Sequence, residues 1–198
     1  MSTLRRPLLT APRFLPLVGV VIGAAGGAAY WIGAQVWPTS IAVALSMLAM
    51  ALLAARMDAP WGAQAGSLGM LGFVFAVLIK YNALMGLSTA SLPFAVPPNV
   101  ALGIIMIAGN AASRALAVSM KPTPLGSLGI ALALGFAPAV FIGVPGLSGL
   151  VAAILGRIAY GAYVRRNRPA VGAADLDVSR QLTEACFYLG ALATRAYI

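Results

Sequence analysis

Few side chains in this chain of 198 residues could carry out acid–base, nucleophilic or metal chemistry. The chain has no histidine, which excludes Ser-His-Asp and Cys-His nucleophiles, histidine acid–base catalysis, haem ligation by histidine and most zinc sites. Its one cysteine, Cys186, lies in an apolar run without a disulfide partner, which favours a small buried side chain over a reactive thiol. The remaining candidates are four carboxylates and two cations inside apolar stretches: Asp58, Asp175, Asp177, Glu184, Lys80 and Arg114.

The elements that must position these side chains are membrane helices. Hydrophobic residues make up 61% of the chain and charged residues only 9%, whereas an ordinary soluble domain has roughly 25% charged residues. The mean hydropathy is +0.95. Because a spanning helix needs about 20 largely apolar residues, the chain has room for about seven spans. We therefore predict an all-α, polytopic integral membrane helical bundle of about seven transmembrane helices, forming a single transmembrane domain over residues 1–198.

Apolar stretches separated by short polar or proline-rich connections give the predicted spans. They cover residues 14–36, 40–55, 67–87, 100–120, 125–144, 147–164 and 179–197, the last being the least apolar at its start. In the first span, Gly19, Gly23 and Gly27 fall four residues apart, on one helical face. This spacing predicts a seam against which another helix packs closely, and it makes a homodimer plausible.

The formal net charge of +9 is a topology signal in a membrane protein rather than an indication of nucleic-acid binding. If the N-terminus is cytoplasmic, the outer connections around Trp37, Pro97 and Pro145 carry no charge, and Arg195 is the one cation at the outer side. All four carboxylates then lie in or next to cytoplasmic segments, so we expect any chemistry at the cytoplasmic face. No predicted span has a carboxylate near its centre, which disfavours an ion channel or a proton pump.

Lys80 and Arg114 fall inside apolar spans, where an ionised group costs several kcal/mol unless it has a partner or a water-filled cavity. Lys80 lies about 13 residues, or roughly 20 Å, from the start of its span, which favours a side chain that snorkels outward. Arg114 is nearer the inner face. The sequence leaves open whether its side chain faces a polar cavity. Asn82 and Asn110 are either partners of these two cations or hydrogen-bonding groups between helices.

Several segments share their pattern and order with one enzyme family. Residues 13–23 read Arg-Phe-Leu-Pro-Leu-Val-Gly-Val-Val-Ile-Gly, Lys80 is followed by Ala83-Leu84, Arg114 follows Ser113, and residues 180–187 read Arg-Gln-Leu-Thr-Glu-Ala-Cys-Phe. They resemble, in this order, four features of the cobalamin synthase family, the adenosylcobinamide-GDP ribazoletransferases. These are the opening Arg-x-Phe-Pro-Leu-Val-Gly-x-x-x-Gly span, the intramembrane Lys-x-x-Ala-Leu, the fourth-span arginine and the closing Gln-Gln-Leu-Ser/Thr-Glu-x-x-Phe segment.

This resemblance implies a multi-pass enzyme of the bacterial inner (plasma) membrane, a Mg²⁺-dependent phosphotransferase of cobalamin biosynthesis. It would join α-ribazole or its 5′-phosphate to adenosylcobinamide-GDP and release GMP, a reaction accelerated by positioning and by cations. The implied Mg²⁺ ligands are Asp58, Asp175 and Asp177, and the implied catalytic residues are Arg114 and Glu184. The implied partners are membrane lipid and the corrinoid nucleotide and ribazole substrates, with no nucleic acid and with homo-oligomerisation left open.

The chain departs from the family pattern in its acidic segment. After the second span the family carries His-x-Asp-Gly-Leu-Ala-Asp-Thr-Ala-Asp-Gly, whereas this chain has only Arg-Met-Asp-Ala-Pro-Trp-Gly-Ala-Gln-Ala-Gly at residues 56–66. Asp58 matches the first of those acids, and the others have no counterpart. Two further accounts of the chain therefore stay open, a non-catalytic binding or scaffold relative without the metal site and a small membrane transporter.

The remaining acids also have alternative roles. Asp175 and Asp177 are two residues apart, so they can share a metal ion in a loop or an extended segment but not in a helix. They are otherwise solvated acids that balance the basic residues 165–168. Glu184 lies four residues after Arg180, and an i,i+4 ion pair accounts for it equally well.

Overall fold

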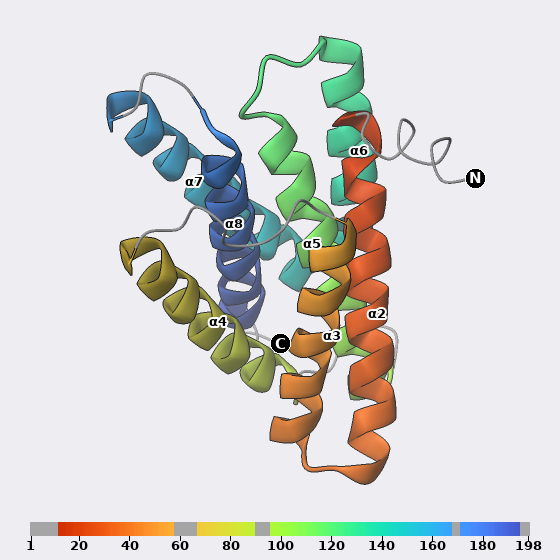
Figure 1. The fold of residues 1–198 in the computed structure, drawn as a ribbon. Helices are drawn as coiled ribbons and strands as arrows, with labels where there is room; N and C mark the ends of the chain where they lie inside the picture. The colour runs from red at the N-terminus through yellow and green to blue at the C-terminus, as the bar shows by residue number, and fades with distance from the viewer. Residues whose placement is uncertain (1–11, 58–66, 90–95, 168–170, 195–198) are drawn as a thin grey trace, which may run out of the picture.

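The computed structural model describes residues 12–57, 67–89, 96–167 and 171–194. Within these ranges the chain forms a 3₁₀ turn, η1 (Pro12–Phe14), followed by seven α-helices. The helices are α2 (Leu15–Val36), α3 (Thr39–Met57), α4 (Ser67–Leu87), α5 (Pro98–Val118), α6 (Leu125–Phe141), α7 (Val144–Asn167) and α8 (Ala173–Ala193). The predicted all-α helical bundle is confirmed, and the predicted limits of the third span coincide with those of α4 (Figure 1).

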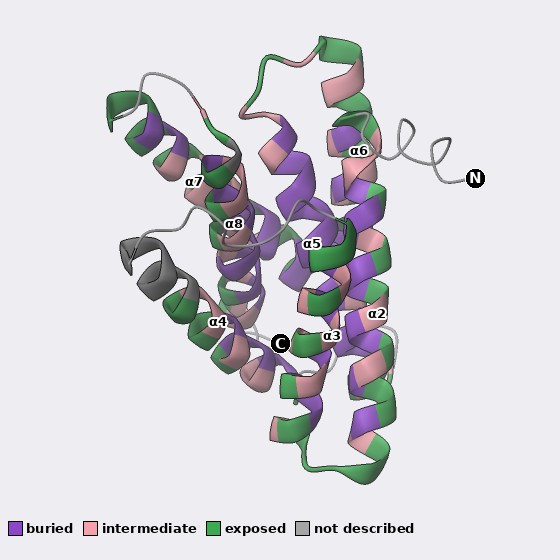
Figure 2. Ribbon diagram, in the orientation of Figure 1, coloured by how far each residue is buried: buried purple, intermediate pink, exposed green. Residues whose placement is uncertain are grey.

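The lengths and surfaces of the helices fit a lipid environment. In the part of the chain that the structure describes, four segments are long and apolar enough to cross a membrane, namely Pro12–Val36, α3, α5 and α7. Large apolar side chains such as Trp31, Leu52, Phe75 and Leu155 are exposed on the outside of the bundle. Figure 2 shows the buried residues on the inward faces of the helices and the exposed ones on the outward faces. The chain is a multi-pass membrane protein.

Helix α5 forms the centre of the bundle, with α2, α6 and α8 packed around it (Figure 1). The glycine seam of α2 faces α5 of the same chain. A methyl group on Gly23 would lie 2.5 Å from Ile107 Cα, and one on Gly27 would lie 2.8 Å from Gly103 Cα. The predicted close helix approach is confirmed, but α5 already covers the seam, so the seam no longer favours a homodimer.

Helix α8 begins six residues before the predicted last span, at Ala173 instead of 179. Its polar first turns are helical because Asp175 Oδ2 accepts a hydrogen bond from the Gly172 N–H, at 2.9 Å, and so satisfies a donor that the helix itself leaves unpaired. The earlier start places Glu184 one residue past the midpoint of the helix. Helix α8 is not among the four described segments that are long and apolar enough to cross a membrane, so the prediction that no span carries a carboxylate near its centre stays a prediction.

Candidate functional site

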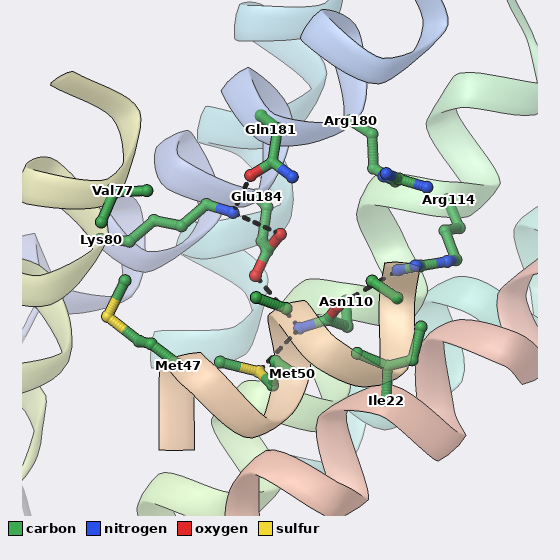
Figure 3. Close-up of a pocket in the computed structure, with 12 residues that line it drawn as sticks. Ile22, Met47, Met50, Val77, Lys80, Asn110, Arg114, Arg180, Gln181 and Glu184 are labelled. Carbon is green, nitrogen blue, oxygen red and sulfur yellow. Dashed lines mark hydrogen bonds and ion pairs between the residues drawn. The ribbon is translucent and has the colours of Figure 1, made fainter. Parts of the chain in front are cut away.

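A pocket among α2, α3, α4, α5 and α8 collects several buried charged side chains (Figure 3). The cavity itself measures about 60 Å³, and about 470 Å³ when the open space at its mouth is included. The residues that line it are Ile22, Met47, Met50, Ala51, Ala54, Val77, Lys80, Asn110, Arg114, Arg180, Gln181 and Glu184.

Lys80 reaches this pocket from α4. Its Nζ lies 2.7 Å from Glu184 Oε2 and also donates a hydrogen bond to Gln181 Oε1, and the residue is only 6% exposed. The prediction that Lys80 snorkels outward is therefore wrong. The distance along the helix did not reveal that α8 presents a carboxylate and an amide to this face of α4. Burial of the ammonium is tolerated because it has an opposite charge and a hydrogen-bond acceptor.

Glu184 is surrounded by donors from three helices. Besides Lys80, Tyr188 donates a hydrogen bond to Glu184 Oε1 at 3.0 Å, and Asn110 Nδ2 donates one at 3.1 Å. The expected i,i+4 pair of Glu184 with Arg180 is not formed, since Arg180 Nη2 instead lies 3.2 Å from Asp177 Oδ1. With three donors around it, the Glu184 carboxylate holds Lys80 and Asn110 in place. Its catalytic role stays a prediction.

Asn110 connects Glu184 to Arg114. Arg114 Nη1 donates a hydrogen bond to Asn110 Oδ1 at 3.1 Å, so a continuous chain of polar contacts runs from Lys80 through Glu184 and Asn110 to Arg114. Arg114 is 3% exposed and lines the pocket, so the structure realises the polar-cavity alternative. Of the two asparagines expected as possible partners of the buried cations, Asn110 contacts Arg114. Asn82 is instead exposed and donates a hydrogen bond to the Leu78 carbonyl at 2.8 Å.

Two of the three residues expected to hold Mg²⁺, Asp175 and Asp177, are described by the structure, and it does not bring them together. Asp175 lies in the first turn of α8, where its Oδ1 accepts a hydrogen bond from Tyr160 at 3.4 Å, and Asp177 pairs with Arg180. Side chains two residues apart on a helix diverge, so these acids do not share an ion there. Asp58 lies outside the described residues. In the described part of the chain, no three His, Cys, Asp or Glu side chains are grouped to hold a metal. The described residues alone do not form a Mg²⁺ site.

A capping role for Asp175 gives a testable expectation. Asp175→Ala is expected to lower the free energy of unfolding by about 1 kcal/mol, because the Gly172 N–H loses its acceptor at the start of α8. Asp175→Asn is expected to retain most of that stability, because the amide oxygen can accept the same bond. Thermal unfolding in mild detergent measures both. Equal losses of stability in the two variants would contradict the capping role. They would indicate that the negative charge of Asp175, and not its hydrogen bond, stabilises the start of α8.

Sequence reasoning missed part of this site. Gln181, Glu184 and Tyr188 are spaced i, i+3 and i+7, and Asn110 and Arg114 are spaced i and i+4. Both spacings place polar groups on one face of a largely apolar helix, which is the signal that could have found them. The spacing does not indicate which helix each face meets.

The chain is similar to curated adenosylcobinamide-GDP ribazoletransferases. The protein from Leptothrix cholodnii is 31% identical over 228 aligned positions, which cover 91% of this chain and 84% of that protein. The proteins from Ralstonia nicotianae and Ralstonia pickettii are 31% and 28% identical over 132 residues, and the match spans 55% of this chain and about half (48%) of each relative. No protein-family model and no solved structure matches the chain.

The alignment with the Leptothrix protein is longer than this chain. Since 91% of 198 residues is about 180, about 48 of the 228 aligned positions have no residue here. The shortening expected from the sequence thus has a counterpart in this comparison. The similarity nevertheless extends over nearly the whole chain at 31% identity. The chain therefore belongs to the adenosylcobinamide-GDP ribazoletransferase family.

Proposed function

We propose that this protein is a cobalamin synthase-like membrane transferase that joins α-ribazole or its 5′-phosphate to adenosylcobinamide-GDP and releases GMP. The observation that carries the proposal is the 31% identity to the Leptothrix enzyme over 91% of the chain. The buried cationic pocket supports it, because phosphoryl transfer depends on positioning and on cations that neutralise developing charge.

In the proposed reaction, a ribose hydroxyl of the ribazole attacks the phosphorus next to cobinamide. A new P–O bond forms, the P–O bond to GMP breaks, and the hydroxyl proton leaves to solvent or to a base. Lys80, Arg114 and Arg180 line one pocket and can neutralise phosphate oxygens. Glu184 and Asn110 keep Lys80 and Arg114 in place.

One observation favours a second candidate, a non-catalytic relative that keeps the scaffold and substrate binding. About 48 aligned positions of the comparison with the Leptothrix protein have no residue in this chain. A transporter is not favoured, because all three relatives are named as transferases. A carboxylate near the middle of a helix could also belong to a transport path, but the carboxylate of Glu184 forms an ion pair with Lys80.

We also propose an inner-membrane location with the N-terminus and the charged connections in the cytoplasm. The starts of α2 and α6 and the ends of α5 and α7 lie at the same end of the bundle (Figure 1). That end carries Arg13, Lys121, Arg165 and Arg166. Such an excess of cations is typical of cytoplasmic loops.

The test is a GMP-release assay with the purified chain in lipid, supplied with Mg²⁺, adenosylcobinamide-GDP and α-ribazole. We expect GMP release, and we expect Asp58→Asn to abolish it, because the resemblance assigns to Asp58 the first acid of the family segment. Arg166→Gln, at the exposed end of α7, serves as a control that retains the activity. No GMP above a protein-free sample, with the Leptothrix enzyme active alongside, would favour the non-catalytic relative.

A further inference from the structure

Arg157 is a cation on a membrane helix that lies outside the pocket described above. It belongs to α7, one of the segments able to cross a membrane, and stands ten residues before the last residue of that helix, or about 15 Å along its axis. Its Nε donates a hydrogen bond to the Leu116 carbonyl, near the end of α5, at 3.2 Å. A guanidinium group has five N–H donors. Toward the residues that the structure describes, Arg157 uses one of them, which leaves the Nη groups for a ligand.

Arg165 brings a second guanidinium group to the same place. Arg157, Gly161 and Arg165 are spaced four residues apart, so they lie on one face of α7. A methyl group on Gly161 would overlap Nη1 of Arg157 and would lie 4.0 Å from Nη1 of Arg165. The two side chains thus extend toward each other along the helix, over a residue that has no side chain, and the charge of Arg165 acts on that of Arg157. We call Arg157 and Arg165 the arginine pair.

Two like charges this close together on a membrane helix favour a negatively charged partner. The carboxylates of α8 are already engaged, since Asp175 caps the helix and Asp177 and Glu184 are in ion pairs. Within the described ranges, neither Arg157 nor Arg165 forms an ion pair with a carboxylate. An ionised group in a bilayer is costly unless it has a partner or water. The geometry therefore favours an anion from outside the chain.

The surroundings of the arginine pair indicate what kind of molecule carries that anion. Leu155 and Ile158 of α7 are 61% and 57% exposed, so an apolar surface begins next to Arg157. The arginine pair lies on the half of α7 that leads to the end of the bundle where α5 also ends (Figure 1). A phospholipid has a phosphate, which guanidinium groups bind through paired hydrogen bonds, and acyl chains that cover apolar side chains. A water-soluble anion matches the first of these features but not the second.

We infer that Arg157 and Arg165 form a binding site for the headgroup phosphate of an anionic phospholipid, and that Gly161 allows the Arg157 guanidinium to lie against the helix between them. An anionic headgroup is preferred over a phosphocholine, because the choline cation would meet the same two positive charges. Since Arg157 also bonds to Leu116, the bound lipid joins α7 to the end of α5. The site is separate from the pocket and does not depend on the proposed reaction.

The inference is tested by native mass spectrometry of the full chain in detergent, titrated with phosphatidylglycerol or phosphatidylcholine of the same acyl chains. We expect one phosphatidylglycerol to bind at least about tenfold more tightly than phosphatidylcholine, since a hydrogen bond to a charged group contributes that much or more. Arg157→Gln and Arg165→Gln should each remove most of this preference. Arg157→Lys should retain part of it, because lysine keeps the charge but not the paired donors. Arg166→Gln, which removes one charge from the exposed neighbouring position, should leave the preference unchanged.

Gly161→Ala distinguishes a built site from general attraction between charges. The added methyl group overlaps Arg157 Nη1, so the guanidinium must move, while the net charge of the chain stays the same. We expect weaker binding of phosphatidylglycerol and no loss of thermal stability in the absence of added lipid, because alanine is the better helix former. Gly129→Ala is the matched control, since a methyl group on this α6 glycine meets nothing within 4 Å, and it should leave lipid binding unchanged.

Three results would overturn the inference. Equal binding of phosphatidylglycerol and phosphatidylcholine would show that no anionic headgroup is selected. An Arg166→Gln variant that loses as much preference as Arg165→Gln would show only a general attraction to positive charge. Displacement of bound phosphatidylglycerol by an equal concentration of inorganic phosphate would assign the arginine pair to a water-soluble anion. The site predicts no such displacement, because free phosphate gains nothing from the apolar surface next to the pair.

Discussion

Glu184→Gln is expected to lower the free energy of unfolding by about 3–5 kcal/mol, the cost of leaving one charge of a buried ion pair without its counter-charge. In the native protein the Lys80 ammonium lies 2.7 Å from the Glu184 carboxylate, and both side chains are at most 8% exposed. A neutral amide keeps a hydrogen-bond acceptor but loses the charge that compensates the desolvation of Lys80. Denaturant unfolding of the purified protein in mild detergent, followed by tryptophan fluorescence, measures the loss.

A double-mutant cycle tests whether the loss comes from the pair. Lys80→Met alone should also be strongly destabilising, because the Glu184 carboxylate then keeps only Asn110 and Tyr188 as donors. The double variant Lys80→Met/Glu184→Gln should recover much of the loss, since it buries neither charge of the pair. Arg166→Gln is the control, because Arg166 is exposed at the end of α7 and such surface substitutions usually change the free energy of unfolding by about 0.5 kcal/mol or less. Strictly additive losses would show that Lys80 and Glu184 do not act together.

The helices were predictable where an apolar run has clear ends. The limits of α4, Ser67–Leu87, follow directly from a glycine-containing polar segment before the helix and a polar turn after it. The start of α8 was not predictable by the same reasoning, because its first turns carry Asp175, Asp177 and Arg180. Hydropathy marks where a chain is apolar, whereas this helix begins where a side chain can cap it.

The candidate site was predictable only in part, for a different reason. Arg114 and Glu184 stand out as charges in apolar surroundings, and both lie at the pocket. The assignment of Lys80 failed because its position along a straight helix was used to place it, whereas its partners Gln181 and Glu184 are 101 and 104 residues away in the sequence. Contacts of that kind depend on how helices pack. The sequence shows which face of each helix is polar but not which faces meet.

The packing of α2 on α5 is the contact on which the position of Asn110 and Arg114 depends, and Gly23 tests it. In Gly23→Ala the added methyl group would lie 2.5 Å from Ile107 Cα, a backbone atom that cannot turn aside as a side chain would. The two helices must separate, and we expect a loss of about 3 kcal/mol in the free energy of unfolding, at the upper end for overpacking. Thermal unfolding in detergent measures it.

Gly129→Ala is the matched control, because a methyl group on this α6 glycine meets nothing within 4 Å. It should be neutral or stabilising by up to about 1 kcal/mol, as alanine is the better helix former. Since the seam is covered by α5 of the same chain, the effect of Gly23→Ala should not change with protein concentration. A loss that grows on dilution would instead show that Gly23 packs against a second copy of the chain, and α5 would then no longer be the helix that fills the seam.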